Sequence, residues 1–309
     1  MALDVRPIIP SRFFGHKSRG AAPSSRIGAY IALMKLRVVE LLLVTTVPTM
    51  VLAEGGWPSI QLMAITLIGG TLAAGGANAI NMYIDRDIDK LMVRTQNRPL
   101  VTGALTPRAA MIFAVALEIV AFLVLWAGAN LLAAVLAVSA TLFYVFVYSL
   151  WLKRTSKQNI VIGGAAGAMP VLVGWAAVTN SLGWAPVVLF VVIFLWTPPH
   201  FWALAIRHAD DYKAAGVPMM PVVVSLERTV RSMTTYAVLL TLSTLVLIPV
   251  AGLGWIYGIT ALVFGVAFVI GSVRLGSDPS PKRSMRLFTF SITYVTAVFV
   301  SLTVDVLLR

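Results

Sequence analysis

Long apolar runs dominate this chain and restrict it to folds that can lie inside a lipid bilayer. Nine runs approach the length that an α-helix needs to cross a membrane, about 20 residues. They cover roughly 31–53, 59–82, 108–128, 130–152, 159–179, 184–206, 232–252, 255–274 and 287–308. Membrane β-barrels have short strands of alternating polarity, whereas these runs are unbroken. The sequence therefore predicts an all-α, polytopic membrane protein with about nine transmembrane helices around a central cavity.

The composition agrees with this class. Hydrophobic residues make up 59% of the 309 residues, and only 12% are charged, against about 25% in a soluble domain. The chain has no cysteine, which excludes disulfides, thiolate metal sites and a cysteine nucleophile. Residues 1–28 are polar and basic and are expected to form a disordered cytoplasmic tail. Residues 29–309 contain no linker, so we expect one transmembrane domain.

The net charge of +12 reflects topology rather than nucleic-acid binding. The connections near 54–58, 126–130, 180–184 and 252–256 contain no Lys or Arg, and 23 of the 24 basic residues fall on the other side of the predicted helices. This distribution is the positive-inside pattern. It predicts a cytoplasmic N-terminus and an external C-terminus, in the bacterial inner membrane or, alternatively, the mitochondrial inner membrane. The lipid bilayer is the expected partner, and no nucleic acid is expected.

A row of oxygen-bearing side chains follows the second apolar run. Asn81, Asp85 and Asp89 are four residues apart, so a helix continuing through them would bring them to nearly the same face. Mg²⁺ prefers oxygen ligands and commonly binds through one or two carboxylates plus substrate phosphates. The basic residues that follow suit the phosphates themselves. The spacing predicts a metal–diphosphate site at the membrane surface, while Asp87 points off this face and is expected to form a surface ion pair.

A second acidic pair, Asp210 and Asp211, follows the sixth run on the same predicted side of the membrane. Two carboxylate clusters in one site would repel each other unless cations lie between them. We therefore expect the two clusters to form one composite site.

The sixth run itself contains two prolines before His200, which should kink the helix. If helix resumes after them, His200, Arg207 and Asp211 share one face. The sequence leaves two roles open for His200, a ligand-binding side chain or a structural side chain bonded to the carbonyls that the prolines free.

Several motifs resemble a known family. Asn81-Met-Tyr-Ile-Asp-Arg-Asp-Ile-Asp89, followed by Arg94-Thr-x-x-Arg98-Pro99, resembles the first motif of the UbiA superfamily of intramembrane prenyltransferases. Three further stretches resemble its haem-farnesylating branch, the protohaem IX farnesyltransferases. These are 152–164, Trp196-Thr-Pro-Pro-His-Phe-Trp202 and the segment 211–221, which begins Asp-Tyr-Lys. The chain departs from the pattern at Leu36, where that branch usually has proline, and after Asp211, where the full Asp-xxx-Asp of other branches is missing.

The resemblance implies farnesyl diphosphate and haem B as substrates, haem O and pyrophosphate as products, and Mg²⁺ as cofactor. It implies catalytic roles for Asn81, Asp85, Asp89, Asp211 and Tyr148, and a metal-ligand set of Asn81, Asp85, Asp89, Asp210 and Asp211. The implied diphosphate-binding residues are Arg37, Lys90, Arg94, Arg98, Lys153, Arg154 and Lys213. The implied haem-binding residues are His200, Arg207 and His208. Haem A synthase or terminal-oxidase assembly factors are the implied protein partners.

Three other functions remain open at this point. Another member of the superfamily would carry the same Asn-Asp motif and act on a quinone precursor or another aromatic or tetrapyrrole acceptor. Intramembrane carboxylates and proline-broken helices also suit an ion-coupled transporter. A non-catalytic haem chaperone is the third alternative.

Overall fold

The computed structural model describes residues 25–278 and 280–309, and for residues 37, 38 and 40–43 it describes the backbone alone. All regular structure in this part of the chain is helical, as predicted. The long helices are α2 (Leu36–Glu54), α3 (Ile60–Ile84), α5 (Pro107–Gly128), α6 (Leu131–Leu142), α8 (Asn159–Thr179), α9 (Trp184–Arg207), α12 (Leu226–Ala251), α13 (Trp255–Ser277) and α14 (Pro281–Leu307). Helix α6 continues through the π-helical segment η3 (Phe143–Leu152) into α7 (Lys153–Thr155). The short helices are α1 (Arg26–Met34), η2 (Ile88–Lys90), α4 (Pro99–Thr102), α10 (Ala209–Ala214) and α11 (Met220–Val223).

Within the described residues, eight helical segments are long and apolar enough to span a membrane, and they coincide with the second to ninth predicted runs. The first predicted run, 31–53, is not one helix. Lys35 adopts a left-handed conformation with φ 52° and ψ 52°, which separates α1 from α2. A left-handed residue interrupts the helical hydrogen bonds, so α1 and α2 are separate helices. Helix α1 begins at Arg26, before the predicted domain start at residue 29.

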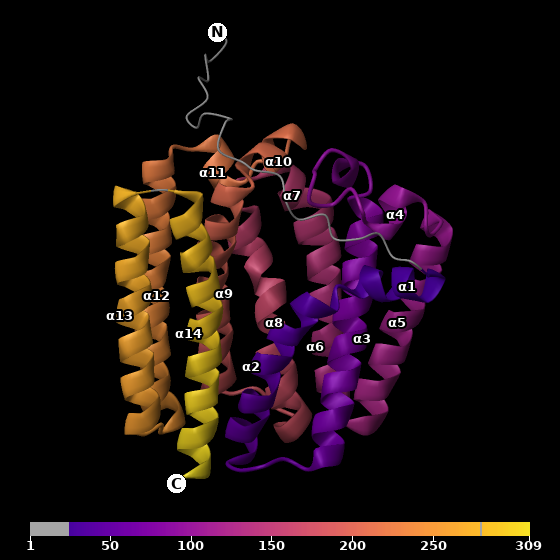
Figure 1. Ribbon diagram of the computed structural model, residues 1–309. Helices are drawn as coiled ribbons and strands as arrows, with labels where there is room; N and C mark the ends of the chain where they lie inside the picture. Colours follow the sequence, from indigo (N-terminus) through magenta and orange to yellow (C-terminus); the bar gives the residue numbers. More distant parts are fainter. Residues whose placement is uncertain (1–24, 279) are drawn as a thin grey trace.

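The long helices stand side by side as a bundle (Figure 1). Helices α12, α13 and α14 form one side, where α14 packs against α9 and α2. Helices α3 and α5 pack together on the other side, with α1 lying across them. The C-terminus lies at the opposite end of the bundle from α10 and α11. Helix α3 ends at this end of the bundle, which also carries α4, α7, α10 and α11. We call it the acidic end, because Asp85, Asp89, Asp210 and Asp211 belong to it.

Small residues allow the close packing of α3. A Cβ atom at Gly76 would lie 2.6 Å from a Glu118 carboxylate oxygen, and one at Gly69 would lie 2.6 Å from Leu125. Close approach of this kind holds membrane helices together, since lipid tails are as apolar as the side chains between helices. Glu118 also accepts a hydrogen bond from Thr141 Oγ1 at 3.1 Å. This intramembrane carboxyl group therefore joins α3, α5 and α6.

Candidate active site

Asn81 is the centre of a buried polar network at the end of α3. Its Nδ2 donates to Asp85 Oδ2 at 2.8 Å and to Ser149 Oγ at 3.0 Å. Its Oδ1 accepts from Lys35 Nζ at 2.9 Å. Both Asn81 and Asp85 are buried. The network joins three separate elements, so it fixes the position of Asp85 in the bundle.

The predicted continuous helix through Asp89 is wrong beyond Ile84, where α3 ends. Asp85 is the C-cap, and a short 3-10 turn, η2, follows at Ile88–Lys90. The backbone N–H of Asp89 still donates to the Asp85 carbonyl at 2.8 Å. One helical turn therefore survives between the two carboxylates, and Asp89 is buried like Asp85.

Two predicted diphosphate-binding cations contact these carboxylates directly. Lys153 Nζ forms an ion pair with Asp85 Oδ2, and Arg98 Nη1 lies 2.5 Å from Asp89 Oδ2. Lys153 reaches the site from the end of η3, and Arg98 from the turn before α4. The acidic end thus pairs buried carboxylates with buried or half-buried cations.

Arg154 lies at the rim of this cluster. It makes two 2.7 Å hydrogen bonds to Asp87 and a 2.9 Å bond to the Ile84 carbonyl, and its Nη2 is 3.9 Å from Asp85 Oδ1. The hydrogen bonds from Arg154 hold the pKa of the Asp87 carboxyl well below its ordinary value. The predicted surface ion pair of Asp87 is confirmed.

One oxygen on each buried carboxylate has no hydrogen-bond partner, namely Asp85 Oδ1 and Asp89 Oδ1. A buried acceptor without a partner costs about 1–3 kcal/mol, and a bound cation would compensate that cost. Among the described residues, no group of three or more His, Cys, Asp or Glu side chains is arranged to hold a metal alone. Two carboxylates, each with one oxygen that accepts no hydrogen bond, fit Mg²⁺ whose remaining ligands are substrate phosphates.

The second acidic pair lies at the same end but not on the predicted helix face. Helix α9 ends at Arg207, and Asp211 belongs to the separate helix α10, so the expected continuous face from His200 to Asp211 is wrong. Asp211 Oδ1 accepts from the backbone N–H of Val93 at 3.2 Å, which ties α10 to the loop after Asp89. Asp210, by contrast, is exposed.

Three of the remaining predicted diphosphate-binding residues lie at the protein surface. Lys90, Arg94 and Lys213 are exposed. Arg94 lies over the Tyr212 ring, with its guanidinium carbon 5.8 Å from the ring centre. His208 Nδ1 is 3.8 Å from Asp211 Oδ2, and burial lowers the His208 pKa below its ordinary value. The side chain of Arg37 lies outside the described part of the structure.

Tyr148 lies in the π-helical segment beside Ser149. Its ring stacks on Tyr144, with ring centres 5.3 Å apart and an interplanar angle of 15°. The ring also packs against Gly163 of α8, where a Cβ atom would lie 2.3 Å from it. Turns of π-helix are frequent at functional sites. Here the turn presents two aromatic rings next to the residue that bonds Asn81.

His200 is packed between α9 and α14. Its Nδ1 lies 2.6 Å from Ser291 Oγ. Trp196 stacks at 4.1 Å and Phe288 at 4.5 Å between ring centres. Its observed partner is a hydroxyl of α14 rather than a carbonyl freed by the prolines. The haem-binding role of His200 stays a prediction, because these contacts are those of a packed core side chain.

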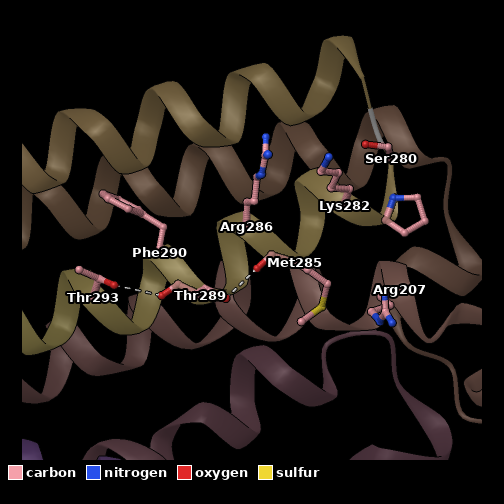
Figure 2. A pocket seen from close by; sticks show the side chains of 9 residues that line it. Arg207, Ser280, Lys282, Met285, Arg286, Thr289, Phe290 and Thr293 are labelled. Atoms are coloured by element: carbon pink, nitrogen blue, oxygen red, sulfur yellow. Dashed lines mark hydrogen bonds between the residues drawn. The ribbon is translucent and has the colours of Figure 1, made fainter. Parts of the chain in front are cut away.

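A groove of about 800 Å³ lies at the acidic end, between the end of α9 and the first half of α14. Figure 2 shows three cationic side chains along it, those of Arg207, Lys282 and Arg286. Met285 and Phe290 supply apolar surface in the same groove. Sequence reasoning missed Lys282 and Arg286, because the positive-inside pattern already accounted for their charges. It also missed the contact of Lys35 with Asn81, which no local pattern indicates.

The fold and the site define an integral membrane protein with buried carboxylates and cations clustered at one end of a helical bundle, the arrangement expected of an intramembrane prenyltransferase. The model of the UbiA prenyltransferase family matches residues 42–296. The chain belongs to the UbiA prenyltransferase family.

Two curated relatives are similar over nearly their whole length. Protoheme IX farnesyltransferase of Frankia casuarinae is 53% identical over 290 residues, which cover 92% of this chain and 99% of the relative. Protoheme IX farnesyltransferase of Streptomyces avermitilis is 48% identical, with 94% and 98% covered.

Solved structures support the fold. A structure of digeranylgeranylglyceryl phosphate synthase matches with a TM-score of 0.76 at 17% identity, covering 92% of this chain and 99% of the other. A UbiA homologue from Archaeoglobus fulgidus bound to GPP and Mg²⁺ matches with a TM-score of 0.65 at 19% identity, covering 89% and 99%.

Proposed function

We propose that this chain transfers a farnesyl group from farnesyl diphosphate to a vinyl group of haem B, giving haem O and pyrophosphate. The observation that carries the proposal is the pair of buried carboxylates, Asp85 and Asp89, each with one oxygen that accepts no hydrogen bond, beside Lys153 and Arg98. This arrangement suits a diphosphate bound through a divalent cation. The choice of haem as acceptor rests on the close relatives, which are named protoheme IX farnesyltransferase.

Asp85 and Asp89, with Asp85 held in place by Asn81, would hold Mg²⁺ together with the substrate phosphates. The predicted ligand Asp211 lies in α10 and accepts from the Val93 N–H, so we place it beside this pair rather than in it. When bound, Mg²⁺ supplies electrostatic stabilisation of the diphosphate as the carbon–oxygen bond breaks. Asp210 is exposed, and we place it outside the ligand set.

The cations of the acidic end divide into two groups. Lys35, Arg98 and Lys153 lie within the polar network and would share the diphosphate oxygens with the carboxylates. Lys90, Arg94, Arg154 and Lys213 lie at the rim or are exposed. They attract the anionic substrate toward the site, as does Arg37 by its place in the sequence.

Bond cleavage sends the electron pair to pyrophosphate and leaves an allylic cation on the prenyl chain. The stacked rings of Tyr144 and Tyr148 offer an electron-rich face to that cation. The vinyl carbon of haem then forms the new carbon–carbon bond. Water adds at the neighbouring carbon and releases a proton, which completes the hydroxyethylfarnesyl group.

We place the haem propionates at the groove of Figure 2. Arg207, Lys282 and Arg286 supply three cations there, and Met285 and Phe290 would supply apolar contacts to the ring. Arginine binds carboxylates through paired hydrogen bonds. His208 lies with Asp211 on the diphosphate side, so we assign it there rather than to haem.

The proposed setting is the bacterial inner membrane with the acidic end in the cytoplasm. The basic residues gather at this end, in agreement with the positive-inside pattern. Haem O released there would pass to haem A synthase or to terminal-oxidase assembly factors. Asp85, Asp89 and Asp211 lie at one end of the bundle rather than in the middle of the spans, which disfavours the transporter.

The test is pyrophosphate release by the purified protein in lipid nanodiscs, with Mg²⁺, farnesyl diphosphate and either haem B or 4-hydroxybenzoate as acceptor. We expect release that requires haem B and that stops when EDTA removes the metal. Pyrophosphate release with 4-hydroxybenzoate but not with haem B would indicate that the protein acts on another acceptor. No release with any acceptor would contradict a prenyltransferase.

A further inference from the structure

Asn159 is the first residue of α8 and is completely buried, yet neither atom of its amide group has a hydrogen-bond partner. An asparagine side chain can donate two hydrogen bonds and accept two. Buried polar groups are nearly always paired, so each exception needs a physical explanation. A group that binds during function supplies one.

The position of Asn159 relates it to the diphosphate site. Gly163, one turn further along the same face of α8, contacts the Tyr148 ring. Ile160 belongs to a hydrophobic cluster with Ile88 and Met92 of the loop that follows Asp85. The start of α8 therefore lies against both the aromatic pair and the acidic loop.

Unpaired buried atoms concentrate at this end of the bundle. Across the described residues, seven buried side-chain polar atoms lack a partner, and four of them belong to Asp85, Asp89 and Asn159. The other three are scattered over Trp175, Trp202 and Ser272.

We propose that Asn159 is a substrate-binding residue of the prenyl diphosphate site, whose Nδ2 donates a hydrogen bond to a diphosphate oxygen. Its Oδ1 accepts from water that enters with the substrate. A neutral amide suits this place, since it adds a donor without adding charge beside Asp85 and Asp89. The inference deepens the proposed function and depends on it.

The experiment is calorimetric titration of the nanodisc-embedded protein with farnesyl S-thiolodiphosphate in the presence of Mg²⁺. Asn159→Leu removes both unpaired groups and keeps the branching of the side chain, and Asn159→Asp keeps the shape but replaces the donor with a negative charge. The control is Gln158→Leu, which changes an exposed amide at the neighbouring position. We expect at least tenfold weaker binding for Asn159→Leu, weaker binding again for Asn159→Asp, and a change within twofold for the control.

Thermal unfolding without ligand gives a second measurement. An unpaired amide contributes nothing to the folded protein, so Asn159→Leu should unfold at the same or a higher temperature. Unchanged affinity in either Asn159 variant would overturn the inference. If Asn159→Leu does not fold, the affinity of Asn159→Asp decides. If the unmodified protein fails to bind the analogue with Mg²⁺, it is the proposed function that fails.

Discussion

The ion pair between Lys153 and Asp85 lies inside the acidic end, and Lys153→Met removes the cation while keeping most of the aliphatic chain. Asp85 is 0% exposed and the Lys153 side chain is 12% exposed. Removing one partner of a buried pair leaves an uncompensated charge and costs about 3–5 kcal/mol. Because Asn81 still donates to the same carboxylate oxygen, we expect the lower half of that range. At about 2 °C per kcal/mol for a chain of this length, the melting temperature falls by roughly 6–8 °C.

The assay is thermal unfolding in detergent, followed by tryptophan fluorescence, with and without Mg²⁺ and pyrophosphate. Mg²⁺ with pyrophosphate should restore part of the lost stability in Lys153→Met, since a bound cation compensates the Asp85 charge. Lys157→Met is the matched control, because Lys157 is exposed and belongs to the same connection. If Lys153→Met lowers the melting temperature no more than Lys157→Met, the buried ion pair is not a source of stability and the reasoning is refuted.

Three further changes test the packing, the haem groove and the far end of the bundle. Gly76→Ala should destabilise the protein by about 1–3 kcal/mol through overpacking, because the added Cβ would lie 2.6 Å from the Glu118 carboxylate oxygen. The control Gly70→Ala meets nothing within 4 Å and should leave the melting temperature unchanged. Arg286→Gln should raise the KM for haem B severalfold and leave the KM for farnesyl diphosphate unchanged. The control is Arg283→Gln, because the Arg283 guanidinium pairs with Asp278 at 3.0 Å. An equal effect of both changes would argue against haem binding at the groove. Asp305→Ala removes the carboxylate that accepts from two backbone N–H groups at the start of α13, at 2.7 and 3.0 Å. It should lower the free energy of unfolding by about 1–3 kcal/mol and leave kcat at 25 °C intact. Lost turnover at unchanged stability would contradict this structural role.

Hydropathy predicted most of the fold. In the part of the chain that the structure describes, eight of the predicted runs are helices that are long and apolar enough to span a membrane. A membrane span needs only length and apolarity, both of which can be read locally. The break at Lys35 was not predictable in this way. Left-handed backbone usually requires glycine or asparagine, and a lysine there carries no local signal.

The candidate site was predicted in its residue types and only partly in its geometry. The four-residue spacing predicted one polar cluster of Asn81, Asp85 and Asp89, but it did not predict that the helix ends at Ile84. Periodicity shows which positions would share a face, but it does not show where the chain leaves the helix. The hydrogen bond of Asn81 to Ser149 crosses between helices 68 residues apart in sequence, and no pattern within one segment contains that information.

The most direct test of the account is mass spectrometry of haems extracted from bacterial membranes that contain this chain, Asp85→Asn or Asp87→Asn. Asp85 is the buried carboxylate of the proposed metal–diphosphate site, whereas Asp87 is 60% exposed and paired with Arg154. We expect farnesylated haem with the unmodified chain and with Asp87→Asn, and none with Asp85→Asn at equal protein level. Farnesylated haem at an undiminished level with Asp85→Asn would contradict the central claim that the buried carboxylates carry the transfer.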